Sequence, residues 1–190
     1  MKIVVKMIAA ATIMGGVVSC GAPKEEVPAD FKYLIDEFAD LKIMRYRVPG
    51  WDALTLRQKE YVYHLSEAAK YGRDILWDQN CAVNLPVRHV LEDIIEKYDG
   101  DKECQEYADF LVYAKRVFFS NGIHHHYAEE KFFPECSREY FASLMAAVGD
   151  EDAELLEAIY SPTLYRWRKA DEGDIVKGSS VNFYEGVNRK

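Results

Sequence analysis

Three observations in the sequence predict a mostly α-helical domain. Apolar residues recur at helical spacing in several separate segments, helix-capping residues stand at the starts of most of these segments, and glycine or proline stands at several of their ends. Hydrophobic residues make up 49% of the 190 residues, which is enough for a packed core. We therefore expect a multi-helix domain over residues 31–190, with room for one or two short strands.

The first strand and helix follow from local patterns. Residues 41–48 alternate imperfectly between apolar and polar side chains, which favours a short strand before the turn at Pro49. Thr55 and Gln58 have the spacing of a capping box, so we expect a helix from Thr55 to about Trp77.

Four further helices are predicted downstream. Asn84 is a suitable cap for the second helix, which has Pro86 in its first turn and ends at Gly100. We expect the other three helices at about 102–120, 137–149 and 151–160, because each has an apolar stripe and end signals.

Residues 1–19 have the composition of a signal peptide. Lys2 and Lys6 precede an apolar run of roughly a dozen residues, which is shorter than the ~20 residues of a membrane-spanning helix. We expect this segment to direct export.

The segment that ends at Cys20 is similar to the lipobox of bacterial lipoproteins, in which this cysteine receives the lipid. A plain signal peptide, with Cys20 incidental, is the alternative. The acidic stretch at 24–26 is similar to the export signal of surface-displayed lipoproteins. We expect an outer-membrane lipoprotein, periplasmic or at the cell surface, that meets the membrane only through its lipid, with residues 20–30 as a tether.

Charge and missing motifs exclude several functions. The net charge of −8 argues against nucleic-acid binding, which needs a basic face. The sequence has no dinucleotide fingerprint, no phosphate-binding loop and no nucleophile elbow. Cys81, Cys104 and Cys136 lack metal-ligand spacing, and whether two of them form a disulfide stays open.

The unusual local feature is a run of three histidines after the third helix. In an extended loop, His124 and His126 would lie on one side and could clamp a metal, but no third ligand stands out. The alternative is a loop that lines a cleft or whose imidazoles bind the backbone. We take the cleft-lining candidates to be Asn121, Gly122, His124, His125, His126 and Tyr127.

Four segments together resemble the bacterial dipeptidyl peptidase III family. They are residues 41–51, 72–80, 120–127 and 180–187, and the resemblance covers nearly all of 31–187. Members of this family use one zinc ion to release dipeptides from the N-termini of oligopeptides. Their zinc is held by an H-E-x-x-G-H helix and a glutamate, in a two-lobed enzyme several times longer than this chain.

The resemblance implies that these 190 residues are the N-terminal portion of such an enzyme, contributing to its lower lobe. The H-E-x-x-G-H motif is not present, so no catalytic or zinc-binding residue is assigned within the chain. We expect zinc in the whole enzyme only, the C-terminal lobe as the partner and no activity from this chain alone. The alternative is a non-catalytic helical surface lipoprotein that binds peptides or a protein partner.

Overall fold

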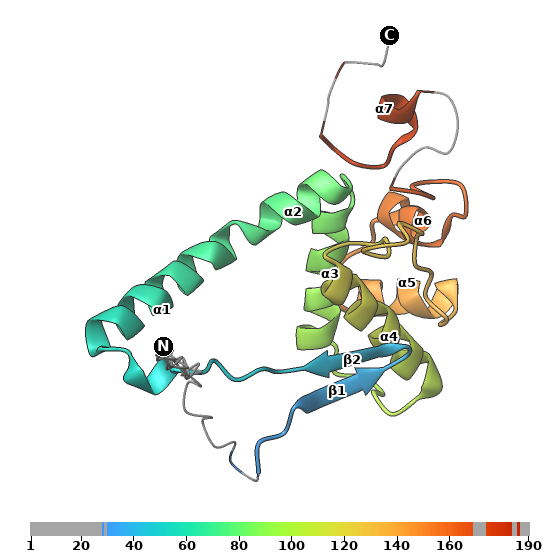
Figure 1. Cartoon of the computed structure of the whole chain (residues 1–190). Helices are drawn as coiled ribbons and strands as arrows, with labels where there is room; N and C mark the ends of the chain where they lie inside the picture. The colour runs from blue at the N-terminus through green and yellow to red at the C-terminus, as the bar shows by residue number, and fades with distance from the viewer. Residues whose placement is uncertain (1–27, 29, 169–173, 184–185, 187–190) are drawn as a thin grey trace, which may run out of the picture.

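The computed structural model describes residues 28, 30–168, 174–183 and 186. The predicted signal peptide, Cys20 and most of the tether lie outside these residues. The described chain is mostly helical and carries one short two-stranded antiparallel sheet, which confirms the predicted fold class (Figure 1). No helix in these ranges has the length and apolar character needed to cross a membrane.

The sheet is a hairpin of strands β1 (Leu34–Phe38) and β2 (Leu41–Met44). Ala39 turns the chain with a positive φ of 50°. The hairpin is tied to helix α4 (Gln105–Ser120) by two ion pairs at 2.7 Å, Lys115 with Asp36 and Arg116 with Asp40. The predicted strand at 41–48 is therefore present but stops at Met44.

A 3-10 turn (Trp51–Ala53) leads from the hairpin into helices α1 (Leu56–Tyr71) and α2 (Arg73–Asn80). The capping box of Thr55 and Gln58 is present, as predicted. Instead of one helix to Trp77, the structure has two, which meet at Gly72. Glycine has a low helix propensity, and this weak point accounts for the break.

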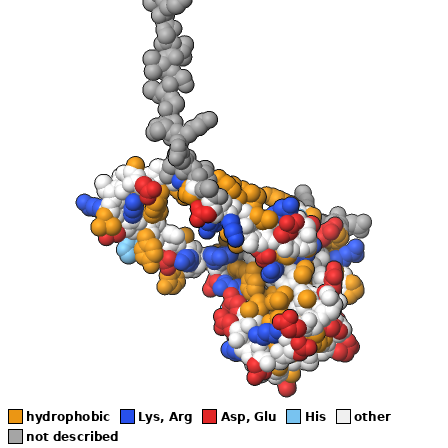
Figure 2. All heavy atoms as spheres, turned by 90° about the horizontal axis from the view of Figure 1, so that it is seen from below, with side chains coloured by type: hydrophobic (Ala, Val, Ile, Leu, Met, Phe, Trp, Pro, Cys, Tyr) orange, Lys and Arg blue, Asp and Glu red, His pale blue; other side chains and the backbone are white. Residues whose placement is uncertain are grey.

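Helix α1 projects from the rest of the molecule as an arm, and α2 connects it to the bundle (Figure 1). None of the residues of α1 is buried, although its sequence has an apolar stripe. Hydrophobic side chains are therefore visible on the surface of the arm (Figure 2). We name the exposed apolar side chains of α1 and α2 the arm patch: Leu56, Tyr61, Val62, Tyr63, Leu65, Tyr71, Ile75 and Leu76.

The bundle consists of α3 (Asn84–Lys97), α4, α5 (Arg138–Ala147) and α6 (Ala153–Tyr160). Helix α3 contacts α2, α4, α5 and α6, so it forms the centre of the core. Ser137 caps α5 as predicted, and Asp152 caps α6 by accepting two backbone hydrogen bonds at 2.9 Å. The largest fully buried side chains of the helices are Trp77, Leu91, Ile94, Phe110, Tyr113, Phe141, Leu144, Met145 and Ile159.

A short helix, α7 (Ile175–Gly178), lies in the C-terminal segment. This segment returns to α2, where the backbone N–H of Asn182 donates to the carbonyl of Gln79 at 2.8 Å. The hairpin is thus attached to α4 and the C-terminal segment to α2.

Candidate functional site

The predicted cleft residues lie together in the connection that follows α4. We name residues 121–133 the His loop. Its two sides pair through the backbone, because the N–H of His125 donates to the carbonyl of Glu130, and the N–H of Phe132 to that of Ile123, each at 2.7 Å. The histidine run thus sits in a narrow turn of defined geometry.

Asn121 and Gly122 end α4, as predicted. Asn121 has a left-handed conformation, and its side-chain oxygen accepts a hydrogen bond from Arg73 of α2 at 3.0 Å. Gly122 has a φ of +151°, in a region that favours glycine. These two residues form the junction between the bundle, the arm and the His loop.

The side chain of Asn84 connects the segments that meet at this junction. The prediction that its side chain caps α3 is wrong, because α3 begins at Asn84 itself and the side chain is fully buried. Its Nδ2 donates to the carbonyl of Trp77 and its Oδ1 accepts from the N–H of Ile123, both at 3.0 Å. The amide satisfies two backbone groups far apart in sequence, and no local pattern could reveal this role.

His124 is the buried member of the run, with 2% of its surface exposed. Its Nε2 lies 2.8 Å from the carbonyl of Tyr165, so the ring must carry its proton on Nε2. Its Nδ1 has no hydrogen-bond partner among the described residues. Burial, with smaller effects from Arg168 and Lys131, lowers the pKa of His124 to about 4, so the ring is neutral at pH 7.

His125 and His126 have different roles. The Nδ1 of His125 accepts hydrogen bonds from the backbone N–H of Tyr127 at 3.2 Å and of Ala128 at 2.9 Å, which closes the turn. The rings of His125 and His126 stack at 4.7 Å, and His126 also packs edge-on against Phe119 at 5.1 Å. Tyr127 is 84% exposed at the tip of the loop.

The histidines therefore contact backbone and aromatic groups. Within the described ranges, no three His, Cys, Asp or Glu side chains gather where they could hold a metal ion. Cys81, Cys104 and Cys136 are free thiols, and burial raises the pKa of Cys81 to about 11. This thiol is thus protonated and a weak nucleophile at pH 7.

Lys131, on the opposite side of the loop from His124, was not singled out by the sequence. It is 7% exposed, and its ammonium donates to three carbonyls: Ala158 at 2.6 Å, Ser161 at 2.7 Å and Leu164 at 2.9 Å. Burial lowers the pKa of Lys131 to about 8, which leaves it cationic at pH 7. We name the carbonyls of Ala158, Ser161 and Leu164 the carbonyl cage of Lys131. The phenylalanines and proline that follow this lysine in the sequence do not indicate that it is buried among carbonyl groups.

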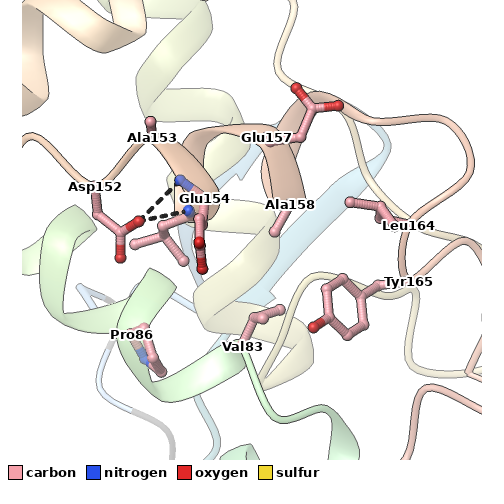
Figure 3. Close-up of a pocket in the computed structure, with 10 residues that line it drawn as sticks. Val83, Pro86, Asp152, Ala153, Glu154, Glu157, Ala158, Leu164 and Tyr165 are labelled. Atoms are coloured by element: carbon pink, nitrogen blue, oxygen red, sulfur yellow. Dashed lines mark hydrogen bonds between the residues drawn. The ribbon is translucent and has the colours of Figure 1, made fainter.

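A pocket of about 490 Å³ lies between the start of α3 and helix α6 (Figure 3). Its apolar wall includes Val83, Pro86 and Leu164. Tyr165, which belongs to the loop that follows α6, also lines the pocket. Asp152, Glu154 and Glu157 line its acidic part.

The acids of this pocket differ in their partners. Asp152 caps α6, and Glu157 pairs with Arg138 at 2.6 Å. The pocket combines an apolar wall with an acidic edge, so it suits an apolar ligand that carries a positive charge. None of the six predicted cleft residues lines this pocket.

The chain matches no protein-family model and no curated protein sequence.

Proposed function

We propose that the chain is the N-terminal, non-catalytic portion of a zinc-dependent dipeptidyl peptidase of the dipeptidyl peptidase III family. The whole enzyme would release N-terminal dipeptides from oligopeptides. The resemblance of residues 41–51, 72–80, 120–127 and 180–187 supports this assignment. We further propose that the lipid on Cys20 holds the protein at the outer membrane.

The arm patch is the structural observation that supports the proposal most. A single helix of 16 residues is only marginally stable in water, and most helical stability in proteins comes from packing an apolar face. Helix α1 buries none of its residues within the described chain. Contiguous exposed apolar surface is typical of an interface. We propose that the C-terminal lobe of the enzyme covers the arm.

The division of labour follows from the chemistry of peptide hydrolysis. A catalytic zinc ion polarises the scissile carbonyl and lowers the pKa of its bound water to about 7. The H-E-x-x-G-H motif that supplies two ligands and the base in this family is not in the 190 residues. The chain would therefore contribute structure and part of the peptide cleft, while the catalytic residues lie in the other lobe.

An assay of the purified chain tests this proposal. With and without added zinc, it should release no dipeptide from a dipeptidyl arylamide. An environment-sensitive apolar dye should bind it, and a variant with Tyr61, Val62 and Leu65 changed to lysine should bind less. A control with three lysines at the exposed polar positions Glu60, His64 and Ser66 should keep the dye signal. Zinc-dependent hydrolysis by the wild-type chain would contradict the proposal.

The second candidate is a non-catalytic surface lipoprotein that binds peptides, and the pocket of Figure 3 favours it. An apolar wall with an acidic edge fits a peptide with an aliphatic and a basic side chain. Leu164 lies in the pocket and Leu56 lies on the arm, and both are exposed. Calorimetry with such peptides should show binding that Leu164→Arg abolishes and Leu56→Arg leaves unchanged. No heat of binding with the wild-type chain would remove this candidate.

A further inference from the structure

His124 and Lys131 are partners in an isolated antiparallel bridge of the His loop. Both side chains bond the same stretch of chain, the end of α6 and residues 161–168. His124 donates to the carbonyl of Tyr165, and Lys131 donates to those of Ala158, Ser161 and Leu164. Four backbone carbonyls of one segment are thus held by two neighbouring side chains.

We infer that His124 and Lys131 form a pH-sensitive latch, which holds residues 161–168 against the His loop at neutral pH and releases them in mildly acidic solution. The inference is independent of the proposed peptidase function, because it rests only on contacts within the described chain.

Lys131 is the constant part of the latch. An ammonium has three N–H donors, and all three are used by carbonyls here. The carbonyl of Ala158 belongs to the last turn of α6, where it lacks a partner within the helix. Lys131 stays cationic throughout the acidic and neutral range, so its contribution to the latch does not change with pH there.

His124 is the titrating part. Only its Nε2 has a carbonyl acceptor, and its buried Nδ1 faces no hydrogen-bond partner in the described structure. Protonation would place a second N–H and a full charge in a site where the new donor is unsatisfied. A buried charge without a partner is costly, so the protonated ring favours an open state in which water reaches it.

The two cations next to His124 act in the same direction as burial. Lys131 on the His loop and Arg168 on the latched segment both oppose its protonation, and Glu129 favours it. Arg168 pairs with Glu129 at 3.8 Å, and it donates to the carbonyl of His126 at 3.1 Å. The hydroxyl of Ser180, from the C-terminal segment, lies 3.4 Å from Nε2 and carries no charge.

Release of the latch would change the pocket of Figure 3. Ala158, Leu164 and Tyr165 line that pocket, and their carbonyls are three of the four that the latch holds. The neutral state of His124 therefore fixes one wall of the pocket, and any ligand of that pocket should bind more weakly below the window of the transition.

The sign of the effect follows from proton linkage. The pKa of His124 is lowered from 6.5 to about 4 in the latched state, so the open state binds more protons below pH 6.5. Latch stability is complete above pH 6.5 and falls as the pH decreases from 6.5 towards 4. At pH 5 this linkage corresponds to about a thirtyfold loss of protection.

Hydrogen–deuterium exchange of the full chain tests the latch. After correction for intrinsic exchange rates, protection of residues 161–168 should fall about thirtyfold from pH 7.5 to pH 5, while α3 and α4 stay protected. His124→Gln keeps an N–H donor but does not titrate, so its protection should be independent of pH in this range. His64→Gln and His126→Gln, as controls, should respond like the wild type.

Equal protection of the wild-type segment at pH 7.5 and 5, or loss of the response in His126→Gln instead of His124→Gln, would overturn the inference. Should His124→Gln fail to fold, NMR of the wild-type imidazoles decides independently. The latch requires the Nε2–H tautomer of His124 at pH 7 and a pKa well below 6.5. A ring that titrates near 6.5, or that carries its proton on Nδ1, would also overturn it.

Discussion

Gly122 lies directly on the side-chain amide of Asn84, so that a Cβ at position 122 would overlap that amide. The amide in turn bonds the carbonyl of Trp77 and the N–H of Ile123. This contact joins the end of α2, the start of α3 and the start of the His loop at one buried point. The close approach explains why glycine follows Asn121 here.

Replacement of Gly122 by alanine should destabilise the fold. The new Cβ meets the buried Asn84 amide, and the φ of +151° adds strain, so we expect a loss of about 3 kcal/mol in the free energy of unfolding. Gly149 is the matched control, because it has a φ of +82° and a Cβ added there would meet nothing within 4 Å. Gly149→Ala should cost about 1 kcal/mol, measured by urea denaturation, and equal losses would refute the close contact.

Asn84→Ala should cost about 2–3 kcal/mol, because it removes two buried hydrogen bonds and leaves the N–H of Ile123 without its partner. Asn80→Ala serves as the comparison, since Asn80 makes one longer bond, 3.4 Å to the carbonyl of Asn121. It should cost less than about 1 kcal/mol. Thermal unfolding of the two variants measures the difference. An Asn84→Ala variant as stable as the wild type would show that this amide does not hold α2, α3 and the His loop together.

Lys131→Met retains the length of the side chain but removes the donors for three carbonyls. We expect a loss of about 3 kcal/mol, because buried carbonyls are left unsatisfied. Lys42, which pairs with Glu37 at 3.5 Å on the surface, is the control. Lys42→Met should change the unfolding free energy by less than about 0.5 kcal/mol in the same denaturation experiment. A similarly small effect at Lys131 would argue against the carbonyl cage.

The exposed arm makes a further prediction about stability. Leu65 on α1 is 52% exposed, whereas Leu91 on α3 is fully buried. Leu65→Ala should therefore change the unfolding free energy of the chain by no more than about 0.5 kcal/mol, and Leu91→Ala should cost about 3 kcal/mol. A large loss from Leu65→Ala would mean that α1 packs against the chain itself and needs no other cover.

Local signals in the sequence were sufficient for most helices. The capping box at Thr55, the Ser137 cap and the end of α4 at Asn121 are all present, because each depends on residues within one helical turn. The break at Gly72, which divides the first predicted helix into α1 and α2, could not be predicted, because a single glycine within an apolar stripe is also found in continuous helices.

Contacts between segments that are distant in the sequence could not be predicted from local sequence patterns. Strand β1 was not located, since its place depends on β2 and on Lys115 and Arg116 of α4. The carbonyl cage of Lys131 joins segments about 30 residues apart, and Asn84 resembled a cap because asparagine is favoured there. The candidate loop was found from its histidines, but the latch and the pocket wall required the three-dimensional structure.

The proposal that the catalytic residues lie in another portion of the same enzyme is tested most directly at the gene. The DNA that follows the codon for Lys190 should encode, in the same frame or one frameshift away, a segment with the H-E-x-x-G-H motif. Sequencing of the locus and its transcript measures this. A downstream region without that motif would contradict the account of the chain as one portion of a zinc peptidase.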